Sequence, residues 1–409
     1  MASDEDIRSF IEQQRGSGAF DSSGTFSVDL RKARKKSSLA SQDVAGAHCL
    51  LWLQACSFGQ PISVKLTYES AYMNGGLPVD WASLAGMARN EPRADRQRPG
   101  VDLLWRAVQA CAALSEGEPR LRYFSHRDGA FELNLADGQI KVLNRQANSV
   151  DFLGVDFARK GTPLQRAEEA VSLQSRCGFS PCGPQYDSRS LTEENPNGYL
   201  ARPPCTSLWN TYTHPSYLLA LSQVRPRQKH SGFLVAPERN SQIPHASNEH
   251  SVFFLESQKG CQVGLADRVL AIPIGLEGTG QVRLIRYGVV LESIECDLGV
   301  PGAWAQVCVD DLQTDASGLK LIRDPAFDQL MAELKAQVLE LGRKALEQLN
   351  KFMLPLVPEP RPGLMVRLLS WGFGTGSDPS RDSSHRLDSQ LCRDEIRKRL
   401  VAALPGSVK

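Results

Sequence analysis

The sequence has no long apolar run and almost no net charge. A transmembrane helix needs about 20 consecutive apolar residues, and no stretch of the 409 residues approaches that length. The formal net charge is +1, so no global field attracts nucleic acid or an acidic membrane. The first residues, MASDEDIRSF, lack the basic and apolar segments of a secretion signal. We therefore expect a cytoplasmic protein without a membrane partner.

Several catalytic motifs are missing as well. No Gly-x-Ser-x-Gly elbow occurs, so serine hydrolase chemistry has no support in the sequence. Two glycine-rich stretches, GLEGTGQ from Gly275 and GFGTGS from Gly372, lack the Lys-Ser/Thr that completes a phosphate-binding loop. We therefore assign no catalytic residue.

The ten cysteines are scattered and do not predict a metal centre. Several lie inside apolar runs, which is typical of buried, reduced thiols; they are Cys49, Cys56, Cys111 and Cys308. Zinc sites usually contain tighter pairs than the loosely spaced set Cys177, Cys182, Cys205 and His214. Acids at Asp310, Asp311 and Asp315 follow an expected strand in a polar turn, where such residues are common. We expect no metal site.

The most informative stretch is 43–69, DVAGAHCLLWLQACSFGQPISVKLTYE. Residues 44–56 are almost all apolar, which predicts a helix buried on most faces. Gly59 is expected to end this helix in a left-handed conformation, and Pro61 prevents its continuation. Residues 62–69 alternate between apolar and polar, which predicts a strand with one buried face.

The next hundred residues have the pattern of an α/β domain. Asn74, Gly75 and Gly76 form a turn signal, and 80–88 and 102–114 are expected helices. Short alternating runs predict an antiparallel meander with turns at Asp128-Gly129 and Asp137-Gly138; the runs are 120–125, 131–135, 140–143 and 150–157. Helices over such a sheet give a two-layer α/β sandwich.

The remaining residues predict a second α+β domain and a tail. An amphipathic helix at 162–177 leads to strands at 252–255, 268–274, 282–292 and 304–309. A long helix is expected at 325–349, and a final basic helix at 391–404 follows a polar, proline-containing stretch that we expect to be partly disordered. The expected domains are therefore 1–160, 161–354 and 355–409, with a short helix at 4–14 and a strand-to-helix segment at 26–38.

The helix, glycine, strand and turn of 43–76 resemble the N-terminal domain of the GHKL ATPases, the superfamily of gyrase B, MutL, the large heat-shock chaperones and histidine kinases. The resemblance covers roughly residues 20–160. It implies a nucleotide pocket lined by Gln54, Asn74, Gly75 and Gly76, with magnesium near Gln54. It also implies that the second domain is transducer-like, with Lys320 as a candidate for the lysine that reaches the ATP γ-phosphate.

Three residues depart from this family's pattern. Gln54 falls where the resemblance expects the Asn that coordinates magnesium. Leu50 falls where the resemblance expects the general-base Glu, and Met73 falls where it expects the Asp that reads adenine. Leucine cannot accept a proton or orient a water molecule. The resemblance therefore implies a degenerate ATPase fold and favours a protein that is not an enzyme.

We predict a non-catalytic scaffold or regulatory protein that acts through protein contacts or conformational change. We expect no cofactor, and weak binding of ATP with magnesium is left open. The partner is an unidentified protein, and the resemblance also implies a homodimer. Two alternatives remain, an active ATPase and a nucleic-acid-binding module that uses the basic residues 31–36 and the terminal helix.

Overall fold

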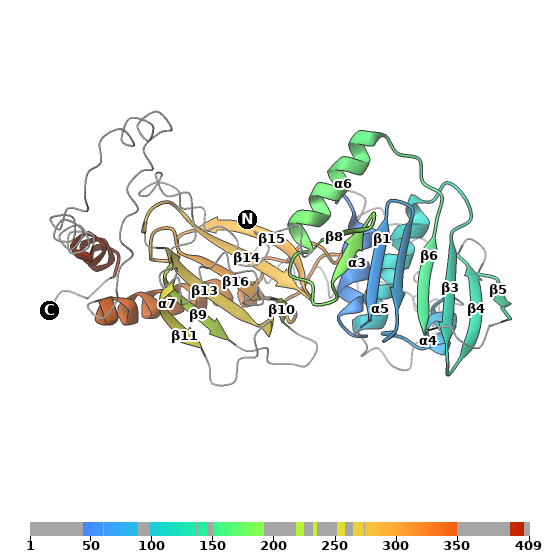
Figure 1. Ribbon diagram of the computed structural model, residues 1–409, viewed down its shortest axis with the longest axis horizontal. Coiled ribbons are helices and arrows are strands. Elements are labelled where there is room, and N and C mark those ends of the chain that lie inside the picture. The colour runs from blue at the N-terminus through green and yellow to red at the C-terminus, as the bar shows by residue number, and fades with distance from the viewer. Residues whose placement is uncertain are drawn as a thin grey trace, which may run out of the picture.

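The computed structural model describes residues 44–59, 61–88, 99–135, 138–144, 150–191, 218–224, 232–234, 252–257, 265–273, 275–349 and 393–404. Within these ranges the protein has a mixed α/β fold, in which two large sheets each pack against helices (Figure 1). None of the described helices is long and apolar enough to span a membrane. The expected segments at 4–14 and 26–38, and the stretch before the terminal helix, lie outside the described residues.

Helix α3 (Ala47–Cys56) is buried along its whole length. Its sequence is apolar all round, so the helix is covered on every face. The left-handed glycine lies before the helix, at Gly46 with φ 74°, and Gly59 does not have a positive φ. The prediction of a left-handed cap at Gly59 is therefore wrong.

The first sheet has eight strands, and the β1–β7 pair is its parallel pairing. In spatial order its strands are β5 (Ile140–Val142), β4 (Gly129–Asn134), β3 (Arg120–Ser125), β6 (Phe152–Asp156), β2 (Ser70–Asn74), β1 (Ser63–Thr67), β7 (Pro184–Tyr186) and β8 (Arg189–Ser190). Strands β3, β4 and β5 form the expected antiparallel meander. The fourth run departs from it, because β6 pairs with β3 and β2 in the middle of the sheet.

Helices α3 and α5 (Pro99–Leu114) pack against each other and lie beside this sheet, with α4 (Trp81–Ala88) against α5 (Figure 1). Helix α6 (Pro163–Arg176) begins with a capping box at Thr162 and contacts both α3 and the second sheet. Strands β7 and β8 follow α6 and return to the first sheet. The first sheet therefore extends beyond residue 160, where the sequence placed a domain boundary.

The second sheet has six strands. In spatial order they are β11 (Val252–Ser257), β9 (Leu218–Val224), β13 (Arg268–Pro273), β16 (Trp304–Cys308), β14 (Gly280–Arg286) and β15 (Val289–Cys296). A two-stranded sheet pairs β10 (Phe233–Leu234) with β12 (Leu265–Ala266). Helix α7 (Pro325–Gln348) packs on β9 and β13, in the region where the sequence predicts a helix over 325–349.

The expected strand at 282–292 is instead a hairpin. Tyr287 and Gly288 both have positive φ, 47° and 76°, and they separate β14 from β15. Apolar residues continue on both sides of this turn, so the alternation in the sequence does not reveal it. One hydrophobic core includes residues from both large sheets, such as Leu66 and Leu121 in the first and Leu284 and Val307 in the second.

Candidate functional site

The four residues expected to line a nucleotide pocket lie on α3 and in the turn after β2. Gln54 is fully buried, and neither polar atom of its amide has a hydrogen-bond partner among the described residues. Asn74, at the end of β2, donates through Nδ2 to Ser63 Oγ at 2.9 Å. Gly75 and Gly76 have φ values of 69° and 47°, which favour glycine.

Close packing joins this turn to the end of α3. A Cβ atom at Gly59 would lie 2.0 Å from the carbonyl oxygen of Gly76 and 2.7 Å from the nitrogen of Pro78. The N–H group of Gly75 donates to the carbonyl oxygen of Asp151 at 2.6 Å. Glycine is therefore needed at position 59 because of this contact, which brings the turn beside the helix that carries Gln54.

The two positions where the resemblance expects an acidic residue are apolar and closed to solvent. Leu50 and Met73 both have 0% exposed surface and belong to the hydrophobic core. The 315–320 segment belongs to the second unit, by which we mean the six-stranded sheet and α7. This segment packs on α3 and α5, because a Cβ atom at Gly318 would lie 3.4 Å from Leu51 Cδ2 and 3.1 Å from Arg106 Nη1.

The remaining candidates from the sequence are dispersed. Lys320 is exposed in the segment 315–320. Asp315 accepts hydrogen bonds from the N–H groups of Ser317 and Gly318, as turn acids do. Cys205 and His214 lie outside the described residues.

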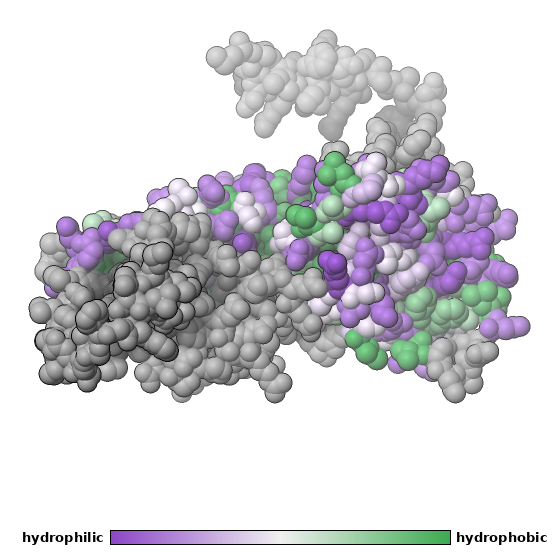
Figure 2. Space-filling view, turned by 45° about the horizontal axis from the view of Figure 1, so that its top comes forward, coloured by the Kyte–Doolittle hydropathy of each residue, from purple (hydrophilic) through white to green (hydrophobic). Residues whose placement is uncertain are grey.

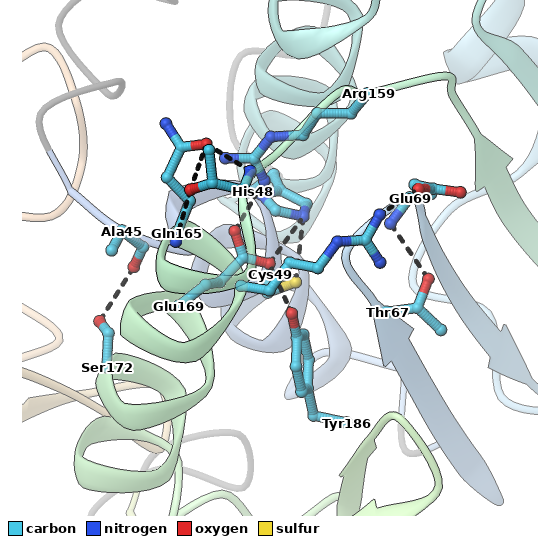
Figure 3. Close-up of polar contacts among 12 residues, drawn as sticks. Ala45, His48, Cys49, Thr67, Glu69, Arg159, Gln165, Glu169, Ser172 and Tyr186 are labelled. Atoms are coloured by element: carbon cyan, nitrogen blue, oxygen red, sulfur yellow. Dashed lines mark hydrogen bonds and ion pairs between the residues drawn. The ribbon is translucent and has the colours of Figure 1, made fainter.

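A buried polar cluster, which the sequence did not predict, lies between α3, α6 and the sheet (Figure 3). His48 and Cys49 of α3 face Glu169 of α6, and their ligand atoms all lie within 4.8 Å of one another. Cys49 Sγ is 3.2 Å from His48 Nε2, and His48 Nε2 is 3.9 Å from Glu169 Oε1. Arg159 Nη1 donates to Glu169 Oε2 at 2.7 Å, and the Tyr186 hydroxyl donates to Oε1 at 3.0 Å.

Burial determines the protonation of this cluster. Burial, together with the nearby Arg159 cation, lowers the pKa of His48 to about 3. Burial also raises the pKa of the Cys49 thiol, as does the Glu169 carboxylate. At neutral pH the imidazole is therefore uncharged and the thiol is protonated. Burial raises the pKa of Glu169 as well, whereas its ion pair with Arg159 opposes this change.

Imidazole, thiolate and carboxylate are all zinc ligands, so we tested whether these residues fit a metal. Both oxygens of Glu169 already accept hydrogen bonds, and one of the donors is a guanidinium group. Zinc would place a second cation beside the guanidinium group that already binds this carboxylate. The arrangement fits a hydrogen-bonded ion pair between α6 and the segment after β6, with His48 of α3 beside it, better than it fits a metal centre.

Part of this cluster is visible in the sequence. His48 interrupts the apolar run of α3, and Glu169 lies on the narrow buried face of the amphipathic α6. Arg159 and Tyr186 come from separate segments, and no local pattern brings them to Glu169. Arg159 also lies over the ring of Tyr68, 3.9 Å from its centroid.

The end of α3 also forms the joint between the two sheets. Ser57 Oγ donates to the carbonyl oxygen of Tyr287 at 2.9 Å, and the rings of Phe58 and Tyr287 pack edge to face with centroids 4.8 Å apart. Arg176, in the last turn of α6, donates to two carbonyl oxygens of β15 at 2.7 and 2.9 Å. The β14–β15 turn is therefore held by both α3 and α6.

No family model matches the chain, and no curated protein sequence matches it.

Proposed function

We propose that the protein is a non-catalytic scaffold or regulatory protein, built on a degenerate GHKL-type nucleotide domain joined to a transducer-like domain. The order of α3, Gly59, β1, β2 and the glycine turn supports the resemblance. So does the position of α3, which packs against β1, β2 and α5.

The proposal rests on the apolar character and the burial of Leu50. Leu50 falls where the resemblance expects the general base, and its side chain is apolar and fully buried. A water molecule that attacks a phosphate needs a positioned acceptor, and no such acceptor exists on a leucine side chain. The contacts of Leu51 and Arg106 with the 315–320 segment indicate that the second unit fills space beside this helix. The protein would therefore work by presenting surfaces to a partner.

The exposed surface is mostly polar, which is compatible with a protein that acts by binding a partner. On the face shown in Figure 2, apolar side chains form small patches among hydrophilic ones. Among the described large apolar residues that are exposed, Ile62 precedes β1 and Val142 ends β5, whereas Leu164 and Val171 both lie on α6. A partner that binds this face would meet mostly polar groups, as in many non-obligate interfaces.

The test is calorimetric titration with ATP and with a non-hydrolysable analogue, each with and without magnesium, followed by a turnover assay. We expect no ATP turnover. Two variants make the test specific, Asn74→Phe in the glycine turn and Asn134→Phe as a matched control, because each residue ends a strand of the first sheet. Steady turnover that Asn74→Phe abolishes and Asn134→Phe preserves would replace this proposal with an active ATPase.

Weak nucleotide binding without hydrolysis is a second candidate, and the Gln54 amide favours it. Buried amides normally have partners, and Gln54 has none among the described residues. Magnesium-dependent heat that Asn74→Phe removes would assign the ligand to this site. Such a result would leave the non-catalytic role intact.

A further inference from the structure

A cavity of about 180 Å³ lies in the second unit, away from the nucleotide-like site. Its walls are the start of β13, the end of β16 and the first turns of α7. For comparison, an engineered apolar cavity of about 150 Å³ accommodates benzene. The cavity therefore has room for a group of several heavy atoms.

The walls of the cavity carry an excess of negative charge. Four carboxylates line it, from Asp267, Asp310, Asp311 and Glu333, against the single guanidinium of Arg268. Asp267 and Arg268 are buried at its base, whereas Asp311 and Glu333 are exposed at its rim. This distribution favours a cationic ligand that enters from the rim.

Asp310 is the carboxylate best placed to receive such a ligand. Its Oδ1 accepts the N–H of Tyr287 at 2.8 Å, and the Cys308 thiol also donates to the carboxyl group. Its Oδ2 is buried and accepts no bond from an N–H or O–H group of the described residues. Burial raises the pKa of Asp310 to about 6, whereas the bonds from the Cys308 thiol and the Tyr287 N–H, and then the nearby Arg286 cation, oppose this rise. The group is therefore ionised at neutral pH, and Oδ2 can accept a stronger, charged donor.

The other residues that line the cavity suit some kinds of cation better than others. Apolar side chains of Leu312 and Leu330 line the cavity with the acids. Calcium takes six to eight oxygen ligands and magnesium keeps its waters, and neither requirement suits apolar walls beside the Arg268 guanidinium. A guanidinium group is planar, weakly hydrated and able to bind a carboxylate through two N–H groups.

We propose that this cavity binds a guanidinium group, with Asp310 Oδ2 as its principal acceptor. The group can come from free arginine or from an arginine side chain of a protein partner. The proposal does not depend on the nucleotide-like site, because the residues involved belong to the second unit.

The experiment is calorimetric titration of the full chain with Nα-acetyl-arginine amide. Nα-acetyl-citrulline amide is the matched ligand, because it has the same shape without the charge. We expect binding of the arginine compound and none of the citrulline compound. Asp310→Asn keeps the Oδ1 acceptor for Tyr287 and should weaken binding roughly tenfold or more, since a hydrogen bond to a charged group contributes about 1.5–3 kcal/mol.

Asp328→Asn is the control variant, because Asp328 lies exposed in the first turn of α7 and does not line the cavity. It should bind as the wild type does. Equal affinity for arginine and citrulline compounds, or wild-type binding by Asp310→Asn, would overturn the proposal. So would calcium or magnesium binding that excludes the arginine compound. Free arginine then identifies the source, because tighter binding of the blocked amide indicates a protein side chain and tighter binding of the free amino acid indicates a metabolite.

Discussion

At the scale of single residues, the Arg159–Glu169 pair shows how a buried charge is held. Arg159 is 18% exposed and Glu169 is 1% exposed, and they are 2.7 Å apart. Such a pair contributes little net stability compared with apolar residues, yet removal of one partner leaves an uncompensated buried charge. The pair therefore ties α6 to the segment that follows β6.

We predict that Arg159→Met lowers the free energy of unfolding by about 3 kcal/mol. Its neighbour provides the control, because the Lys160–Glu116 pair is exposed, at 89% and 48%, and Lys160→Met should cost under about 1 kcal/mol. Adding Glu169→Met to Arg159→Met should recover part of the loss, since no buried charge then remains. Urea denaturation measures all three. Equal losses for the two single variants would contradict a buried structural pair.

At the scale of elements, the β14–β15 turn connects the two sheets. Gly288 has φ 76°, and a Cβ atom there would lie 2.8 Å from Pro181 Cδ and 2.9 Å from Ser180 Cα. Tyr287 extends this connection, because its N–H reaches Asp310 in the cavity and its carbonyl accepts from Ser57 on α3. The turn thus needs glycine for both its backbone conformation and its contacts.

We predict that Gly288→Ala destabilises the protein more than Gly278→Ala does. Gly278 has a similar φ of 81°, but a Cβ atom there meets nothing within 4 Å. Gly278→Ala should cost only the backbone strain, about 1–2 kcal/mol, whereas Gly288→Ala adds overpacking of about 1–3 kcal/mol. Thermal denaturation compares the two variants. Indistinguishable melting temperatures would mean that the residues around Gly288 rearrange without loss of stability.

At the scale of the whole molecule, the two sheets share one hydrophobic core. Its members include Leu50 and Leu104 beside the first sheet and Leu270 and Leu334 in the second unit. If one unit unfolded alone, apolar core residues of the other unit would be exposed to water, which is unfavourable. The two units are therefore expected to unfold together. The shared core therefore favours a fixed arrangement of the two units over two domains that move freely.

We therefore predict a single cooperative transition for the described core in scanning calorimetry, with equal calorimetric and van't Hoff enthalpies. Arg159→Met should move that transition to lower temperature without splitting it. Two resolved transitions in the wild type would show that the contacts between the two sheets contribute little, and a role through relative movement of the two units would then be the better account.

The order of elements was largely predictable, because periodicity is a local property. The apolar run 44–56 gave α3, and the alternation at 62–69 gave β1. Errors arose where a partner far away in the sequence decides the structure. Gly59 is fixed by its contact with Gly76 rather than by a helix cap. The pattern of apolar and polar residues does not reveal the turn at Tyr287, because apolar residues continue on both sides of it.

The residues of the candidate sites also fall into two groups, those that the sequence reveals and those that only the fold brings together. His48 could be read from the sequence, since it departs from the apolar pattern around it. The convergence of Arg159 and Tyr186 on Glu169, and of Asp267 and Asp310 on one cavity, could not. These residues come from different elements, and no spacing along the chain encodes their distance in space.

The sequence by itself determined the mixed α/β class, because the periods of the apolar residues select helices and strands one segment at a time. The tertiary structure decided which strands are neighbours, with β6 between β3 and β2 and with β7 and β8 added to the first sheet beyond residue 160. It also decided that α3 is enclosed by both units. Pairing and burial depend on contacts between distant segments, whose free energy exists only once the whole chain has folded.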